Sequence, residues 1–170
     1  MLRLSGELGD GVVLNSIGTK EYFAYAVSKI HEGAELAGRR KSDLEIAASV
    51  IFSVADSQDD ALDAARPDVL FYLLYQELNP VIEKTRYVQK VNEIREVNSQ
   101  GDAKKALSMV TDEMVSEMSI AGTPKECRKR IKELAEMGIT LPVVRVSVQH
   151  KTEDERKGVF LKAIETLRSL

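Results

Sequence analysis

The polar residues best placed for chemistry follow two apolar runs of the kind that form buried strands. Asn15 and Ser16 follow Val12–Leu14, and Gln149 and His150 end the run that begins at Pro142. An asparagine side chain both donates and accepts hydrogen bonds, which suits recognition of a bound polar group. It also commonly ends a strand and satisfies the next turn, and the residue types alone leave both interpretations open.

Arg145 belongs to the second of these runs, where apolar and polar side chains alternate. One face of this expected strand carries Val144, Val146 and Val148, and the other carries Arg145, Ser147 and Gln149. Alternate residues of a strand point to opposite faces of a sheet, so the polar face is expected to line the interior of a barrel near its mouth. Arg145 then either pairs with an anionic ligand or forms an interior salt bridge.

No familiar catalytic or metal-binding constellation accompanies these residues. Neither His31 nor His150 has a second ligand at metal spacing, so no metal site is predicted, and His31 is expected to be structural. Cys127 lies on the apolar stripe of a helix and is expected to pack in the core. The glycines of Gly6–Gly11 lead from a helix into a strand, the reverse of the order that directs backbone amides at a phosphate. The catalytic residues stay unassigned.

Composition restricts the class of protein. The chain has 170 residues, 24 basic against 27 acidic, and no Lys/Arg-rich block, so a nucleic-acid partner is not expected. A single cysteine excludes an intrachain disulfide, and no apolar run is long enough for a membrane span or a signal peptide. We expect a cytoplasmic protein with no membrane partner, forming a single domain over residues 1–170.

The elements that must position these residues alternate between strand and helix. After a helix tail over Leu2–Leu8, we expect strands at Val12–Leu14, Leu44–Val54 and Pro142–Gln149, and helices capped by Thr19, Ser57, Thr123 and Thr152. The final helix should bury Val159, Phe160, Ala163, Ile164 and Leu167. Residues 59–118 contain no convincing strand, which predicts a helical insertion over about 79–118, with breaks at Asn79–Pro80 and Asn98–Asp102.

Such alternation predicts an α/β fold with parallel strands and right-handed crossovers. Three strands cannot close a barrel, and a (β/α)8 barrel typically needs about 250 residues. We therefore expect a partial (half) TIM barrel with a helical insertion. The apolar stripe of Leu2, Leu4 and Leu8 begins with almost no helix before it, so the element that should precede Met1 is expected to be missing.

Five stretches, in this order and spacing, resemble one known group of proteins. They are Leu2–Asn15, Glu21–Tyr22, Ile30–Arg39, Ala64–Pro67 and Ile120–Cys127, the last reading Ile-Ala-Gly-Thr-Pro-Lys-Glu-Cys. Together they resemble the bacterial-luciferase-like superfamily, and within it the branch that contains coenzyme F-420-dependent methylenetetrahydromethanopterin reductase. The resemblance extends from Met1 to about Val148 and places the three expected strands as the sixth to eighth of the barrel.

The resemblance implies the C-terminal portion of an oxidoreductase that moves hydride between a reduced deazaflavin, coenzyme F-420, and a one-carbon pterin. It implies cofactor contacts for Asn15 and Ser16 and substrate contacts for Gln149 and His150, with most of the cofactor bound by residues absent from this chain. The alternatives are an FMN-dependent monooxygenase and a non-catalytic half-barrel that binds or assembles. In either case exposed strand edges are expected to pair with a second copy or with a separate N-terminal half.

Overall fold

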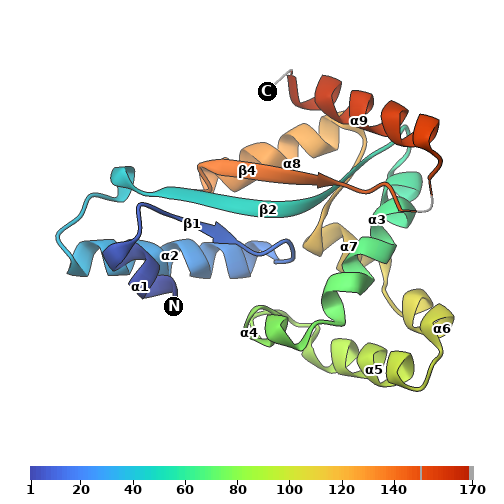
Figure 1. The fold of residues 1–170 in the computed structure, drawn as a ribbon, viewed down its shortest axis with the longest axis horizontal. Coiled ribbons are helices and arrows are strands. Elements are labelled where there is room, and N and C mark those ends of the chain that lie inside the picture. The colour runs from blue at the N-terminus through green and yellow to red at the C-terminus, as the bar shows by residue number, and fades with distance from the viewer. Residues whose placement is uncertain (150, 169–170) are drawn as a thin grey trace.

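The computed structural model describes residues 1–149 and 151–168 (Figure 1). Strands and helices alternate, as the sequence predicts. The strands are β1 (Gly11–Leu14), β2 (Glu45–Val54), β3 (Ile120–Gly122) and β4 (Leu141–Val146). The α-helices are α1 (Leu2–Leu8), α2 (Lys20–Leu36), α3 (Gln58–Leu73), α4 (Asn79–Ile82), α5 (Val88–Ser99), α6 (Ala103–Ser108), α7 (Asp112–Met118), α8 (Pro124–Glu136) and α9 (Glu153–Arg168).

The sheet is parallel and is organised around β2. β1 pairs with the first half of β2, with Leu14 opposite Ala48, and β4 pairs along the other edge, with Val146 opposite Phe52. The short strand β3 pairs with the end of β2 through Phe52 and Ile120. The sequence analysis predicted three strands, and this number was wrong because the structure contains a fourth, β3. Three residues are too few to show a strand periodicity, so β3 was hidden beside the helix start that follows it.

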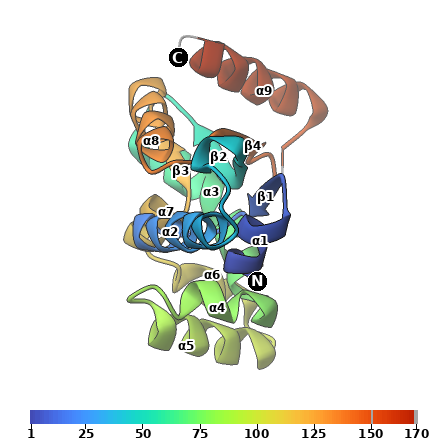
Figure 2. The ribbon, with the colours of Figure 1, turned by 90° about the vertical axis from the view of Figure 1, so that its left-hand side faces the viewer.

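Register divides the sheet into two faces. Val13, Ala47 and Leu141 lie side by side on one face, and Val143 lies further along it; the other face carries Ile46, Ala48, Val50 and Phe52, all buried. Figure 2 shows α2 and α8 together on one side of the sheet. Val13 is 73% exposed, and Leu141 and Val143 are each 43% exposed. The edge strands β1 and β4 therefore leave apolar side chains of one face exposed, whereas β2 between them is buried on both faces, as one part of a barrel wall can be.

Helices α1 and α2 pack with their backbones in direct contact. A Cβ atom added to Gly33 would lie 2.0 Å from the carbonyl oxygen of Arg3, and one added to Gly6 would lie 1.9 Å from the carbonyl oxygen of Ile30. Only glycine fits at such a crossing. The Arg39 guanidinium donates to the carbonyls of Gly6 and Gly9, at 3.0 and 2.6 Å, and so satisfies the end of α1. This packing fixes the start of β1.

The predicted helix starts are confirmed where a cap can be recognised. Thr19 and Ser57 accept hydrogen bonds from backbone amides in the first turns of α2 and α3, and Thr123 and Glu126 form a capping box on α8. The break expected at Asn79–Pro80 lies instead at Leu74–Tyr75, because Pro80 stands in the first turn of α4, where its missing N–H costs nothing. The break expected at Asn98–Asp102 is present after Ser99.

Helix α9 differs from the expectation on one point. Ala163 is buried, but Phe160 and Ile164, which the periodicity placed on the buried face, are 45% and 59% exposed. The side of the helix that packs is centred on Ala163 and Thr166. The apolar stripe of α9 is therefore wider than the surface that this chain offers it.

Candidate functional site

Asn15 and Ser16 lie at the carboxyl end of β1, on the rim of a large groove. The groove has a volume of about 1080 Å³ and runs between α1, the free edge of β1, α2 and α4. Its floor contains a pair of hydroxyl groups, because Ser16 Oγ and Ser49 Oγ lie 2.8 Å apart. Asn15 Oδ1 accepts a hydrogen bond from the Ser16 amide at 2.7 Å, which is the turn-satisfying arrangement that the sequence left open. The exposed side chain still borders the groove.

The walls of this groove carry aromatic rings and charged side chains. Tyr22 and Tyr25 line it from α2, and the ammonium group of Lys84 lies 4.9 Å from the centre of the Tyr25 ring. Burial raises the pKa of the Tyr22 phenol, so this hydroxyl is neutral at physiological pH. Arg3 and Lys29 are both paired with Glu32, at 2.5 and 2.7 Å. The groove thus offers ring faces and hydroxyls, and two of its three lining cationic side chains, Arg3 and Lys29, are already paired with a carboxylate.

The second pair of predicted site residues lies across β2 from the first, at the end of β4. Gln149 Nε2 donates to Asp68 Oδ1 of α3, and the Arg145 guanidinium lies 5.2 Å from the centre of the Tyr72 ring of the same helix. Arg145 is exposed and has no ion-pair partner among the described residues. The interior salt bridge considered for Arg145 is therefore not formed within this part of the chain. His150 lies outside the described residues.

Beyond Arg145, a polar pocket of about 350 Å³ lies between the ends of β2 and β4, α3 and α9. Ser147 lines it and is 1% exposed, and its hydroxyl has no hydrogen-bond partner in the described structure. Lys162 is paired with Asp56 at 2.6 Å, and Glu155 accepts from Thr152 as a helix cap, so most charges of this pocket are already satisfied. The lining carries three carboxylates, Asp56, Asp60 and Glu155, against the two lysines Lys151 and Lys162.

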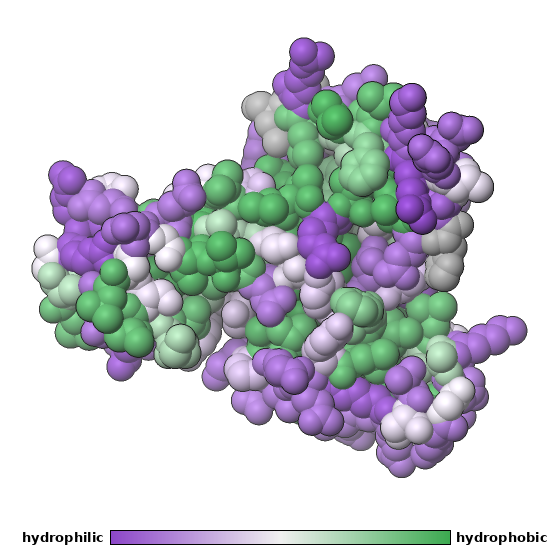
Figure 3. All heavy atoms as spheres, viewed as in Figure 1, coloured by the Kyte–Doolittle hydropathy of each residue, from purple (hydrophilic) through white to green (hydrophobic). Residues whose placement is uncertain are grey.

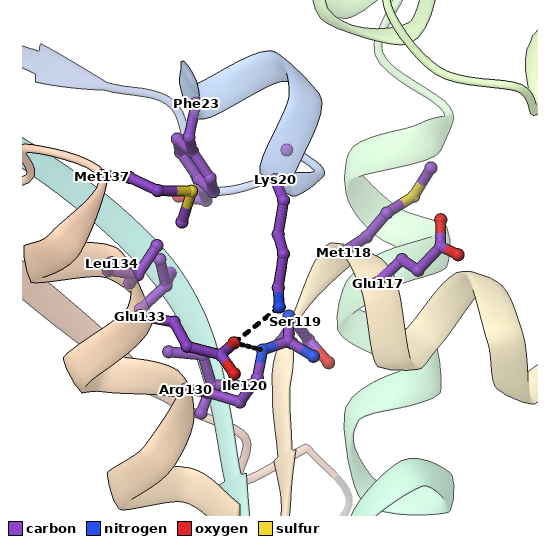
Figure 4. A pocket seen from close by; sticks show the side chains of 13 residues that line it. Lys20, Phe23, Glu117, Met118, Ser119, Ile120, Arg130, Glu133, Leu134 and Met137 are labelled. Atoms are coloured by element: carbon purple, nitrogen blue, oxygen red, sulfur yellow. Dashed lines mark hydrogen bonds and ion pairs between the residues drawn. The ribbon is translucent and has the colours of Figure 1, made fainter. Parts of the chain in front are cut away.

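A small cavity, shown in Figure 4, lies where α2, α7 and α8 meet. Its volume of about 20 Å³ suffices for one water molecule. Glu133 pairs with Lys20 at 2.7 Å, and Arg130 donates to the carbonyls of Ser116 and Ser119 at 2.8 and 3.3 Å. The hydrogen bond from Lys20 holds the pKa of Glu133 low, and burial lowers the pKa of Arg130. This cluster ties α7 to α2 and α8 and has no room for an organic ligand.

His31 and Cys127 have the structural positions expected of them. Burial lowers the pKa of the half-buried His31, which keeps the imidazole neutral near pH 7. Cys127 is 1% exposed, and burial raises the pKa of its thiol to about 11. Within residues 1–149 and 151–168, no three His, Cys, Asp or Glu side chains lie close enough to hold a metal ion. The same residues include no helix that is long and apolar enough to cross a membrane.

Sequence reasoning missed two features near the predicted site. Ser49 interrupts the apolar run of β2 and bonds to Ser16, and a polar residue inside such a run was the signal for it. The exposed rings of Phe71 and Tyr75 lie beside Tyr72 on α3, next to Arg145. Tyr75 follows the end of α3 at Leu73, so helix periodicity does not predict this contact, and the ring distances show it.

Comparison with known proteins places this geometry in a family. Residues 1–141 match the family model described as luciferase-like monooxygenase. The chain is 35% identical over 145 residues to the 5,10-methylenetetrahydromethanopterin reductase of Methanopyrus kandleri, covering 85% of this chain and 41% of that protein. It is 32% identical over 174 residues to the reductase of the same name from Archaeoglobus fulgidus, covering 100% of this chain and 51% of that protein. The chain thus spans about half the length of these relatives.

Solved structures agree with this assignment. The coenzyme F-420-dependent tetrahydromethanopterin reductase from Methanopyrus kandleri superposes with a TM-score of 0.75 at 32% identity, covering 92% of this chain and 44% of that one. An F-420-dependent secondary alcohol dehydrogenase superposes with a TM-score of 0.64 at 23% identity, covering 97% of this chain and 45% of that one, and supports the fold. The predicted partial barrel and the predicted superfamily are both confirmed. The chain belongs to the luciferase-like monooxygenase family.

Proposed function

We propose that this chain is the C-terminal portion of an F-420-dependent oxidoreductase that transfers hydride between a reduced deazaflavin and a one-carbon pterin. The observation that carries the proposal is the superposition on the F-420-dependent tetrahydromethanopterin reductase, with a TM-score of 0.75 at 32% identity over 92% of the chain. The relatives named methylenetetrahydromethanopterin reductase point to the same reaction.

The groove fits a role in holding a deazaflavin or flavin. Its volume of about 1080 Å³ is sufficient for such a ring system, since small-molecule pockets commonly measure about 300–1,000 Å³. A bound deazaflavin supplies or accepts the hydride, and the protein positions it. In this proposal Asn15 offers its amide group to the ring edge or tail, and Ser16 and Ser49 offer hydroxyls from the floor. These residues orient the cofactor; proton transfer is not assigned to any of them.

The chain alone is proposed to bind cofactor weakly, because its four parallel strands are too few to close a barrel and leave apolar side chains of β1 and β4 exposed. Completion would come from a separate N-terminal half or, less fully, from a second copy. The test is to express the remaining half of the Methanopyrus kandleri relative together with this chain and to follow F-420 oxidation spectroscopically with a methylene-pterin as acceptor. Pterin-dependent oxidation of reduced F-420 supports the proposal.

FMN is the alternative cofactor, since an FMN-bound monooxygenase shares the fold with a TM-score of 0.53. Fluorescence titrations of the restored barrel with F-420 and with FMN separate the two. Preferential FMN binding, with oxygen consumption in place of pterin-linked F-420 oxidation, would replace the reductase assignment with a monooxygenase. A barrel that forms but binds neither cofactor would leave the chain as a binding or assembly module.

A further inference from the structure

Three aromatic rings form a cluster at the end of α3 and just after it. Phe71 lies 5.4 Å from Tyr72 and 5.0 Å from Tyr75 between ring centroids, and Tyr72 and Tyr75 lie 6.5 Å apart. Phe71 is 47% exposed and Tyr75 is 45% exposed. The whole chain has only nine Phe and Tyr residues, so three within five positions is a strong local concentration. We call Phe71, Tyr72 and Tyr75 the aromatic face of α3.

A cation from the sheet extends this aromatic face. The Arg145 guanidinium lies 5.2 Å from the Tyr72 ring centre, on the open side of β4. Stacking uses the planar surface of the guanidinium and leaves its N–H groups free to bind a carbonyl or an anionic oxygen. Asp68 and Gln149 form a hydrogen-bonded pair one helical turn before Tyr72. Ring faces and hydrogen-bonding edges therefore occur together, which a purely apolar protein contact would not require.

The aromatic face is held in place by Arg95 of α5. Its guanidinium donates to the carbonyls of Leu73 and Tyr75, at 2.6 and 2.8 Å, and to Asn79 Oδ1 at 2.6 Å. These bonds satisfy the carboxyl end of α3 and fix the turn that follows it. Figure 1 shows that α5 lies beneath the end of α3, away from the sheet. A surface fixed before binding loses little conformational entropy when a ligand arrives.

We infer that the aromatic face of α3, together with Arg145, stacks against the planar ring of the pterin substrate. This inference rests on the proposed function. Hydride transfer requires the donor and acceptor rings to lie face to face at close range, so one face of the pterin is turned to the cofactor. The protein must support the other face. β1 and β4 run parallel on either side of β2; β1, which leads into Asn15, ends opposite Ala48, and β4 ends opposite Phe52.

The inference assigns a separate surface to each ring system, one on each side of β2. The groove beside β1 takes the cofactor, and the aromatic face takes the pterin, whose carbonyl meets the N–H groups of Arg145. Phe160 of α9 is 45% exposed, almost the same as Tyr75, but has no ring partner among the described residues. It provides a matched control, since exposure of an aromatic ring alone does not make a stacking site.

The test is calorimetric titration of the 170-residue chain with tetrahydromethanopterin, comparing the unmodified chain with Phe71→Leu, Tyr75→Leu and Phe160→Leu. The first two substitutions should each weaken binding about tenfold, since they remove a ring face while keeping apolar volume. Phe160→Leu should leave the affinity unchanged. Circular dichroism of each variant verifies that the fold is retained.

With the 170-residue chain, three outcomes would overturn the inference: no saturable binding by the unmodified chain, equal effects of all three substitutions, or a change in oligomeric state on Phe71→Leu with pterin affinity intact. The last outcome would make the aromatic face an interface between copies. Failure of the proposed function is distinguishable, because it appears as absent F-420 oxidation in the restored barrel while pterin binding still depends on Phe71 and Tyr75. Unchanged pterin KM in restored barrels carrying Phe71→Leu would overturn the inference while leaving the reductase activity standing.

Discussion

The hydroxyl groups of Ser16 and Ser49 lie 2.8 Å apart and join the loop after β1 to the middle of β2. This bond holds the loop that carries Asn15, whose own Oδ1 accepts from the Ser16 amide. Among the described residues the Asn15 amide nitrogen has no hydrogen-bond partner, so it is the donor that this loop can offer to a ligand. A rigid loop with one free donor suits orientation of a ring better than proton transfer.

The first prediction concerns this donor. In a barrel completed with the N-terminal half of the Methanopyrus kandleri relative, Asn15→Ala should weaken cofactor binding by about 1–3 kcal/mol if its hydrogen bond to the cofactor is buried. The folding stability should change little, because the side chain is exposed in this chain. Fluorescence titration with F-420 measures the affinity, and thermal unfolding followed by circular dichroism measures the stability.

A core substitution provides the control for Asn15→Ala. Ile131 is 5% exposed on α8, so Ile131→Ala should cost about 2–5 kcal/mol of stability. The cofactor affinity of the folded fraction should stay the same. If Asn15→Ala lowers the melting temperature as much as Ile131→Ala and leaves affinity untouched, Asn15 is a turn residue and not a cofactor ligand.

The second prediction is that the isolated chain associates. β1 pairs with β2 alone among the described strands, and Val13 beside its free edge is 73% exposed. Apolar side chains gather across the sheet side of the molecule in Figure 3. Free strand edges with apolar neighbours recruit other chains. Light scattering at micromolar concentrations should therefore show a mass above that of one chain, and Val13→Lys should reduce it. A monodisperse monomer would contradict the prediction.

The elements recovered from sequence are those that a local signal specifies. Thr123 and Glu126 mark the start of α8 by capping chemistry, and the β-branched run of β2 marks a strand covered on both faces. Neither depends on distant partners, so short-range physics suffices for both. Asn15 and Ser16 were located for the same reason, since a polar pair directly after an apolar run predicts a strand end.

What escaped prediction depends on contacts between segments distant in sequence. β3 is defined by its pairing with Phe52, some seventy positions earlier, and Ser49 becomes a groove residue only through Ser16. The apolar periodicity of α9 did not predict which of its residues are buried, because no other described part of this chain covers Phe160 and Ile164. Periodicity shows which residues can be buried, and tertiary packing decides which of them are.

The third prediction concerns Cys127. Burial raises the pKa of its thiol to about 11, and the thiol donates to the carbonyl groups of Ser53 and Gly122. A thiol in the unfolded chain has a pKa of about 8.5. The folded chain should therefore react with a thiol-specific disulfide reagent at pH 8 only at the rate of unfolding. Rapid labelling of the native chain would show that the thiol is accessible after all.

The same shift gives the fourth prediction, a dependence of stability on pH. The unfolded chain loses the thiol proton at lower pH than the folded chain, so the stabilising contribution is complete below about pH 8.5 and is lost as the pH rises toward the folded pKa. Urea unfolding at a series of alkaline pH values should show a decline that is shallower in Cys127→Ala. Parallel curves for the two proteins would contradict it, because other groups titrate equally in both.

The last prediction tests the α1–α2 crossing with one chemical change at two sites. Gly33→Ala places a Cβ atom 2.0 Å from the carbonyl oxygen of Arg3, so the two helix backbones must move apart. Overpacking of this kind costs about 1–3 kcal/mol or more. Gly158→Ala in α9 meets nothing within 4 Å, and there the better helix propensity of alanine should add about 0.5–1 kcal/mol of stability. Urea unfolding of both variants should thus give shifts of opposite sign. Because α1 leads directly into β1, Gly33→Ala should also disturb the loop that carries Asn15 and weaken cofactor binding in the restored barrel, whereas Gly158→Ala should not. Equal stability changes at the two glycines would show that α1 and α2 do not touch at Gly33. The contact that fixes the start of β1 would then be absent.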